Sequence, residues 1–169
     1  MAAAPTYNAI ATNTLTSAQT AVQFNSISGA YTDLVLHCSL KANTTGNSTI
    51  LLTMNQDNSS LYSGAQIYFN TSTYASNKNV NETYIAIARG TGMPAAIGDT
   101  STLVLNFNNY SNTSMFKSII GRYDSPSSGP EIEVGLYRSL SAVSTIRLQV
   151  DTNGFAIGST FTLYGIEAA

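Results

Sequence analysis

The residue types that could carry out chemistry are few in this sequence, and their spacing does not favour catalysis. His37 and Cys38 are the only histidine and the only cysteine. Neighbouring residues of a β-strand point to opposite faces of the sheet, so these two side chains are not expected to form a nucleophile–base pair. Neither has partners for a zinc site. We therefore expect Cys38 in the core and His37 at the surface or in an interface.

Two carboxylates have the spacing of a hydrolytic pair. Glu131 and Glu133 lie two positions apart in an expected strand, hence on one face and roughly 7 Å apart, within the range of glycosidase acid pairs. Two exposed acids on the solvent side of a strand have the same pattern, and glycosidase pairs normally come from different strands across a cleft. We interpret both as solvent-facing, which places Ile132, Val134 and Leu136 toward the core.

The segment from Asp151 to Gly154 begins like a calcium-binding loop, but Thr162 stands where such a loop has its bidentate glutamate. A hairpin turn with the glycine at positive φ explains the segment better, and a weak calcium site is the alternative. Gly90-Thr91-Gly92 is too short for a phosphate-binding loop, and no helix is expected after it. The sequence therefore predicts no catalytic residue, no cofactor and no metal ion.

Composition also bounds the function. The 169 residues suit one domain with a sizeable core. Only 9% of them are charged, against about 25% in an average soluble domain, and Ser, Thr and Asn take their place. The net charge of −2 and the scattered basic residues argue against nucleic-acid binding. No apolar run could span a membrane and the start has no signal peptide, so synthesis in the cytoplasm is expected.

Alternation of apolar and polar residues with a period of two dominates the chain. The clearest segments are 33–41, 49–54, 102–108, 131–137, 145–150 and 159–166. Weaker segments are 7–15, 21–24, 66–69, 84–89 and 116–123. About ten short strands with one apolar face each must bury those faces against one another. The sequence therefore predicts an all-β fold, an antiparallel β-sandwich of jelly-roll type.

Domain organisation is expected to be simple. Residues 21–169 are predicted to form a single β-sandwich domain, with residues 1–20 as an N-terminal arm or edge strand. Gly165, near the end of the last expected strand, suits a close approach between the two sheets. The polar span 55–81 is expected to contain one short strand at most. An excursion of that length usually has a function, such as contacting a neighbour.

Tyrosine is the aromatic residue in excess, with ten copies against six phenylalanines and no tryptophan. Five tyrosines lie in expected loops or outside the core register and are candidate interface residues: Tyr62, Tyr74, Tyr110, Tyr123 and Tyr137. Exposed tyrosines favour protein interfaces and sugar-binding faces, because they combine a large area with a polar tip. Buried tyrosines with hydrogen-bonded hydroxyls are the other interpretation, and the sequence leaves both open.

Several short motifs follow one another in a suggestive order. They are FNSISGAYTDLVL at 24–36, LTMNQDNSSLY at 52–62, NYSNT at 109–113, VSTIRL at 143–148 and GFAIGSTFTLYGI at 154–166. This order resembles β-sandwich modules of structural proteins from tailed bacteriophages, especially phages of aquatic bacteria and cyanobacteria. The resemblance covers residues 24–166, and its last block is the most specific. One departure is Tyr137, where a tryptophan is expected before Arg138 and Ser139.

The resemblance implies a structural role on the outer surface of a virion, and it supplies no catalytic residues. Because the module fills nearly the whole chain, we expect a capsid decoration (cement) protein rather than a fibre with its own shaft. It would be a homotrimer, and its partner would be the lattice of major capsid protein. The alternative is a tail-fibre or tail-tip knob that recognises host-surface glycans. A free carbohydrate-binding or glycan-degrading domain is the third possibility.

Overall fold

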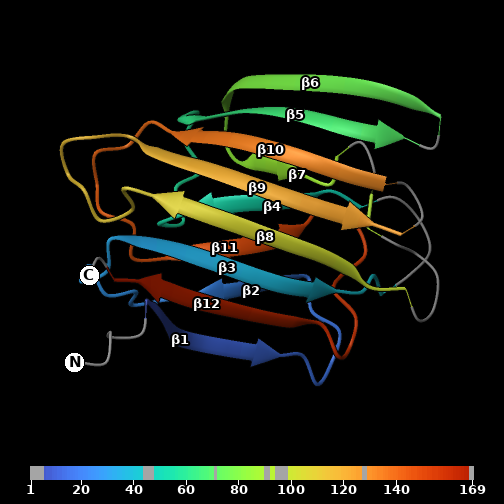
Figure 1. Cartoon of the computed structure of the whole chain (residues 1–169), viewed down its shortest axis with the longest axis horizontal. Helices are drawn as coiled ribbons and strands as arrows, with labels where there is room; N and C mark the ends of the chain where they lie inside the picture. Colours follow the sequence, from blue (N-terminus) through green and yellow to red (C-terminus); the bar gives the residue numbers. More distant parts are fainter. Residues whose placement is uncertain are drawn as a thin grey trace.

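The structure is a computed structural model of the whole chain, and it describes residues 6–43, 48–70, 72–89, 92–93, 99–126 and 129–167. Within these residues twelve strands form two antiparallel sheets, without any helix (Figure 1). The prediction of an all-β protein built as a β-sandwich is confirmed. Gly90 and Thr91 of the short glycine segment lie outside the described residues.

The larger sheet has eight strands in the order β1-β12-β3-β8-β9-β10-β5-β6, with β1 and β6 at its two edges (Figure 1). These strands are β1 (Tyr7–Thr14), β12 (Thr160–Ile166), β3 (Asp33–Leu40), β8 (Ser101–Asn108), β9 (Lys117–Ser125), β10 (Gly129–Tyr137), β5 (Tyr62–Asn70) and β6 (Thr73–Glu82). The smaller sheet has the order β2-β11-β4-β7. Its strands are β2 (Ala21–Phe24), β11 (Ile146–Val150), β4 (Ile50–Met54) and β7 (Ile85–Ile87).

Most connections carry the chain from one sheet to the other. Only the pairs β5–β6 and β9–β10, together with the step from β8 to β9, stay within the larger sheet. Asp151 to Gly154 lies on the crossing from β11 to β12, which belong to different sheets, so the prediction of a hairpin turn is wrong. The positive φ of 62° is at Asn153 rather than at Gly154, since asparagine tolerates the left-handed region better than most residues.

The core lies between the sheets, and strict alternation predicted most of it. The inward residues expected for β3, β4, β8 and β11 are all buried: Leu34, Leu36, Cys38, Leu40, Ile50, Leu52, Met54, Leu103, Leu105, Phe107, Ile146, Leu148 and Val150. Cys38 is a free thiol whose pKa is raised by burial, and His37 is exposed on the other side of the strand. Both predictions for these two residues are confirmed.

The polar span 55–81 is more ordered than its sequence suggests. It contains β5 and most of β6, a hairpin with nine residues paired on each strand, from Tyr62 with Glu82 to Asn70 with Thr73. The prediction of at most one short strand is therefore wrong. No described side chain of β6 is buried. The strand therefore lacks a row of buried apolar residues, and an alternating pattern could not reveal it. Backbone hydrogen bonds to β5 hold it in place instead.

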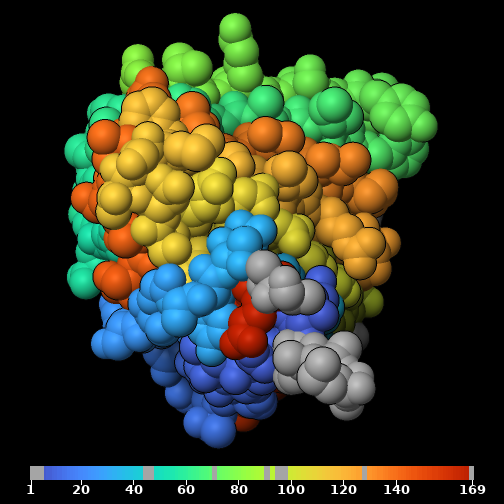
Figure 2. Space-filling view, turned by 60° about the vertical axis from the view of Figure 1, so that its left-hand side comes forward, coloured from blue at the N-terminus to red at the C-terminus, as the bar shows by residue number. Residues whose placement is uncertain are grey.

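The N-terminal segment lies at the opposite edge of the same sheet. Residues 7–14 pair with the last strand, from Tyr7 with Ile166 to Thr14 with Thr160. They form an edge strand and not a free arm. Figure 2 shows this blue strand at one end of the molecule and the green side chains of the β5–β6 hairpin at the other.

Gly165 in β12 is the site of a close approach, as the sequence predicts, but the neighbour is different. A Cβ at this position would lie 2.3–2.6 Å from three ring carbons of Tyr31. Tyr31 belongs to the connection between β2 and β3, so a loop side chain covers the glycine and not the second sheet. The ring seals the end of the sandwich against β12.

We expect Gly165→Ala to lower the stability by about 1–3 kcal/mol, because the new methyl group forces the Tyr31 ring away from β12. Thermal unfolding followed by circular dichroism measures the change. Gly29→Ala is the matched control, because its Cβ would find its nearest neighbour at an ordinary 3.6 Å. An unchanged midpoint for Gly165→Ala would contradict the packing described here.

Candidate interaction surface

Strand β10 faces the opposite way from the sequence-based expectation. Ile132, Val134 and Leu136 point out of the sandwich and are 36–55% exposed, whereas Glu131 and Glu133 point inward and are 1% exposed. Both predictions for this strand are wrong. The alternation of apolar and polar residues shows which side chains share a face of the strand. It does not show which face turns toward the core, because a shift of one residue in the strand pairing exchanges the two faces.

The packing of β7 explains why β10 adopts this orientation. Gly135 lies on the inward side of β10, and a Cβ there would be 2.5 Å from the Cδ1 atom of Ile85 in β7. On the paired strand β5, a Cβ at Gly64 would lie 2.9 Å from the Oε1 atom of Glu133. The inner surface at this point has room for glycine but not for branched side chains. The aliphatic residues therefore take the outer side.

The two glutamates form part of the core rather than an accessible acid pair. Glu131 Oε1 accepts a hydrogen bond from the backbone N–H of Ala88 at 2.8 Å. Burial raises the pKa of Glu133 to about 9, and the neighbouring Glu131 adds to the rise, although a hydrogen bond with Gln66 opposes it. Glu133 Oε2 and Gln66 Oε1 have no hydrogen-bond partner. Glu133 is thus protonated at neutral pH and closed off from substrate.

Because the aliphatic side chains of β10 point outward, exposed apolar side chains are concentrated on one half of the larger sheet. Val134 is paired with Ile120 on β9, and Ile132 is paired with Ile67 on β5. The same side of β6 adds Val80 and Tyr74, through their pairing with residues of β5. We call this set the apolar face: Ile67, Tyr74, Val80, Ile120, Ile132, Val134 and Leu136. It spans four neighbouring strands, in the order β9-β10-β5-β6.

Two shallow grooves run along the apolar face. One is lined by Ile67, Phe69, Tyr74, Pro130 and Ile132 among others, and the Phe69 and Tyr74 rings pack edge to face there with centroids 5.1 Å apart. The other groove is lined by Val104, Asn106, Ile120, Gly121, Arg122 and Ile132. The outward charged side chains of these four strands are Lys78, Arg122 and Asp124. The face is therefore apolar in its middle, with isolated charges of both signs.

The five candidate tyrosines separate into two groups. Tyr74 is 82% exposed and belongs to the apolar face, whereas Tyr62, Tyr110, Tyr123 and Tyr137 are buried. The sequence left two interpretations open for these residues, and exposure at an interface is wrong for these four. The alternative, hydrogen-bonded packing, describes all four. Tyr74 remains a candidate interface residue.

The hydroxyl of each buried tyrosine has a partner, as a buried phenol requires. The hydroxyls of Tyr110, Tyr123 and Tyr137 donate to Ser28 O at 2.5 Å, to Ser101 Oγ at 2.8 Å and to Asp57 Oδ2 at 2.8 Å. The hydroxyl of Tyr62 accepts from Met54 N at 3.0 Å, and its ring stacks on Tyr137 at 4.7 Å. The bonds to Ser28 and Asp57 tie connecting loops to the sandwich, whereas Ser101 and Met54 belong to strands β8 and β4.

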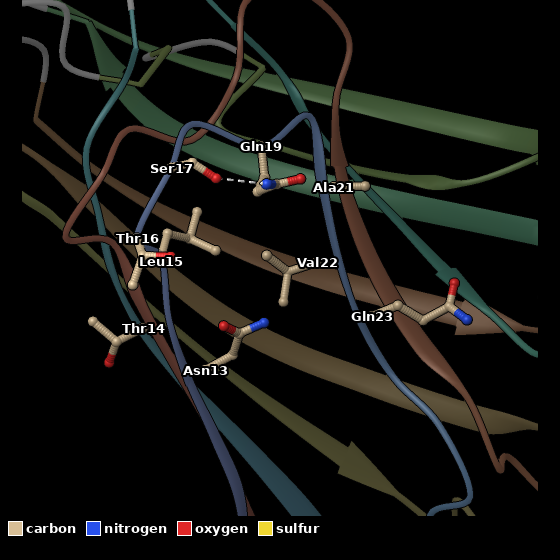
Figure 3. Close-up of a pocket in the computed structure, with 9 residues that line it drawn as sticks. All are labelled: Asn13, Thr14, Leu15, Thr16, Ser17, Gln19, Ala21, Val22 and Gln23. Atoms are coloured by element: carbon tan, nitrogen blue, oxygen red, sulfur yellow. Dashed lines mark hydrogen bonds between the residues drawn. The ribbon is translucent and has the colours of Figure 1, made fainter.

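A polar depression lies between β1 and β2 (Figure 3). Amides and hydroxyls line it, among them Asn13, Ser17, Gln19 and Gln23, and Gln19 Nε2 donates to Ser17 Oγ at 3.0 Å. None of the lining side chains is ionisable at ordinary pH, and none is aromatic. The depression can form hydrogen bonds, but its lining offers no general acid or base.

No protein-family model, curated protein or solved structure matches the chain. Within the described part of the chain no group of three or more His, Cys, Asp and Glu side chains could hold a metal ion. The same residues include no helix that is long and apolar enough to cross a membrane. Asp151 instead accepts a hydrogen bond from Thr49 N at 2.8 Å and one from Thr152 N at 2.7 Å.

The sequence does contain a signal for the apolar face, although the alternation alone does not reveal it. Gly64, Gly121 and Gly135 occupy the same phase as the buried acids on three adjacent strands. Glycines in strands often mark a close approach of another element. The side of the strands that carries these glycines is therefore the side that the second sheet covers. The aliphatic residues, which alternate with the glycines, lie on the outer side.

Proposed function

We propose that this chain is a non-enzymatic structural protein of a tailed-phage virion. More closely, we propose a capsid decoration (cement) protein that binds the lattice of major capsid protein as a homotrimer and stabilises it. The observation that carries the proposal is the apolar face, which a soluble monomer would have to keep in water. Exposed patches of this kind are typical of protein interaction sites. The order of motifs across residues 24–166 supplies the link to virion proteins.

We further assign eight of the strands to a jelly roll, whose two sheets hold four strands each. The strands β1-β12-β3-β8 and β2-β11-β4-β7 would be those two sheets. Once β5–β6 and β9–β10 are set aside, the chain passes between them at every step except from β4 to β7, which are neighbours in the smaller sheet. On this assignment the two additional hairpins extend one sheet. They also carry the whole apolar face, which supports a docking role for the added strands.

The low charge of the chain supports contact with a large assembly. Charged residues make up only 9% of the sequence, so docking would depend on apolar and hydrogen-bonded contacts rather than on ion pairs. Such contacts are little affected by salt. We therefore expect particle binding to change less than about threefold between 50 and 500 mM salt.

Counting the copies of this chain on purified particles tests the proposal. Gel densitometry against the major capsid protein should give hundreds of copies per particle for a decoration protein. Particles that lack the chain should bind the purified protein and then resist heat better, as measured by release of their genome. Absence of the chain from particles, or turnover of a surface polysaccharide by the purified protein, would overturn the proposal.

The alternative proposal is a tail-tip knob that binds host-surface glycans. The polar depression between β1 and β2 favours it, because amides and hydroxyls are suitable partners for sugar hydroxyls. A few copies per particle, located at the tail, would support this alternative. Loss of glycan binding in Gln19→Ala would then assign the site.

A further inference from the structure

We propose that the apolar face binds the apolar face or a neighbouring surface of a second copy of this chain. The inference adds detail to the proposed function. It depends on that proposal only for the expectation that the protein assembles from several copies. It names the surface that joins the subunits to one another. Contact with the capsid lattice would then fall to other parts of the molecule.

The area of the apolar face is close to what a stable interface requires. Its seven side chains keep between 36% and 82% of their surface exposed. At roughly 100 Å² for each such side chain, the face offers about 600–700 Å² of apolar surface. That is at or above the top of the range for the largest patch on a typical monomer, about 300–600 Å². It approaches the roughly 800 Å² that each partner contributes to a standard interface.

The charges on the face favour a copy of the same chain over a charged partner. A strongly charged partner selects a face of opposite charge, whereas the outward charged residues of β5, β6, β9 and β10 are Lys78, Arg122 and Asp124. These charges are few and of both signs, so two such faces can meet without large repulsion. Interfaces between identical subunits are also more apolar than those of transient complexes.

The position of the aliphatic residues favours packing face to face. Val134 and Ile120 lie on β10 and β9, and two strands or more separate them from the free edge of β6. A neighbour that only extended the sheet at β6 would leave both side chains in water. A neighbour packed about 10 Å above the sheet would cover both.

The molar mass of the purified chain tests the inference. We expect wild type at about 10 µM to elute as a multiple of the chain mass in size-exclusion chromatography with light scattering. Val134→Lys should elute as a single chain, with a dissociation constant raised about 100-fold or more. Ile120→Lys is a second variant on the adjacent strand and should behave alike. Circular dichroism must show a folded protein in each case.

Val35→Lys is the matched control. Val35 points to the same side of the same sheet from β3, paired with Asn106 and Tyr164, and lies outside the apolar face. This variant should keep the mass of the wild-type assembly. A single-chain mass for wild type at about 100 µM, or an unchanged mass for folded Val134→Lys, would overturn the inference.

Binding to particles separates this inference from the proposed function. A wild-type oligomer that does not bind particles would refute the decoration role and leave the subunit interface standing. A wild-type monomer that binds particles, and loses binding in Val134→Lys, would mean that the capsid covers the apolar face. That result would overturn the inference and support the decoration role.

Discussion

Leu105→Asp is expected to prevent folding, whereas Val104→Asp is expected to leave a folded single chain. Leu105 in β8 is fully buried between the sheets, and its Cδ2 atom would be 2.4 Å from a Cβ at Gly121 on β9. An aspartate there loses the packing of the leucine and places a carboxylate without a partner in the core. The combined cost exceeds about 5 kcal/mol, which is comparable with the whole stability of a small domain.

Val104 provides the matched control for this prediction. It is the preceding residue of the same strand, only half-buried, and lines the outer groove beside Ile120. A charge there remains in contact with water, so the fold should persist with a change within about 1 kcal/mol. Assembly should weaken because the groove borders the apolar face. Far-ultraviolet circular dichroism and thermal unfolding distinguish the two variants, and equal midpoints for Leu105→Asp and wild type would show that the register of β8 is wrong.

Stability is expected to fall as pH rises, and Glu133 is the residue responsible. Its pKa is about 9 in the folded chain and near 4.5 as a free side chain. Between these values the folded state keeps a proton that the unfolded state releases, so the stabilisation is complete below pH 4.5 and is lost toward pH 9. At 1.36 kcal/mol per pKa unit the loss reaches up to about 6 kcal/mol. Urea unfolding at pH 5, 7 and 9 measures it.

Glu133→Gln should flatten this pH profile and make the chain more stable than wild type at pH 9. The amide carries no charge to bury, and its N–H₂ group can donate to Gln66 Oε1, which has no partner in the wild type. Glu167→Gln, at an exposed position after β12, should leave the difference between pH 5 and pH 9 as it is. A Glu133→Gln profile as steep as that of wild type would assign the pH dependence to another group.

Much of the fold could be predicted from the alternation of apolar and polar residues. This pattern gives the orientation of a strand when one of its faces is apolar and the other is polar and can face water. In β3 one face carries Leu34 and Leu36 and the other carries Asp33 and His37, so only the orientation with the leucines inward is favourable. In β10 the phase opposite the aliphatic residues contains Glu131, Glu133 and Gly135. The usual preference for apolar residues in the core then gives the wrong side, because the packing of β7 against the glycine decides the orientation.

The remaining differences have a similar origin in tertiary contacts. Lysine is rarely fully buried, yet Lys117 is buried in β9 and its Nζ donates to three carbonyl oxygens, those of Asn112, Met115 and Ser139. These partners come from loops that alternation does not place. The buried tyrosines are similar, because each phenol has a partner in a loop: a carbonyl oxygen of Asp57, Ser28 or Gly92, or the Asp57 carboxylate. The apolar face was missed for the same reason as the orientation of β10.

The pairing of β1 with β12 has a consequence for biogenesis. Because Tyr7 lies beside Ile166, the first strand finds its neighbour only after the last strand has left the ribosome. Such high contact order makes folding slow compared with proteins of local topology. The hairpins β5–β6 and β9–β10 can form much earlier, since their strands are adjacent in sequence. A nascent chain would therefore display Val134 and its aliphatic neighbours before the sandwich closes, and closure leaves them exposed. The chain would depend on chaperones or low concentration until a second copy covers them.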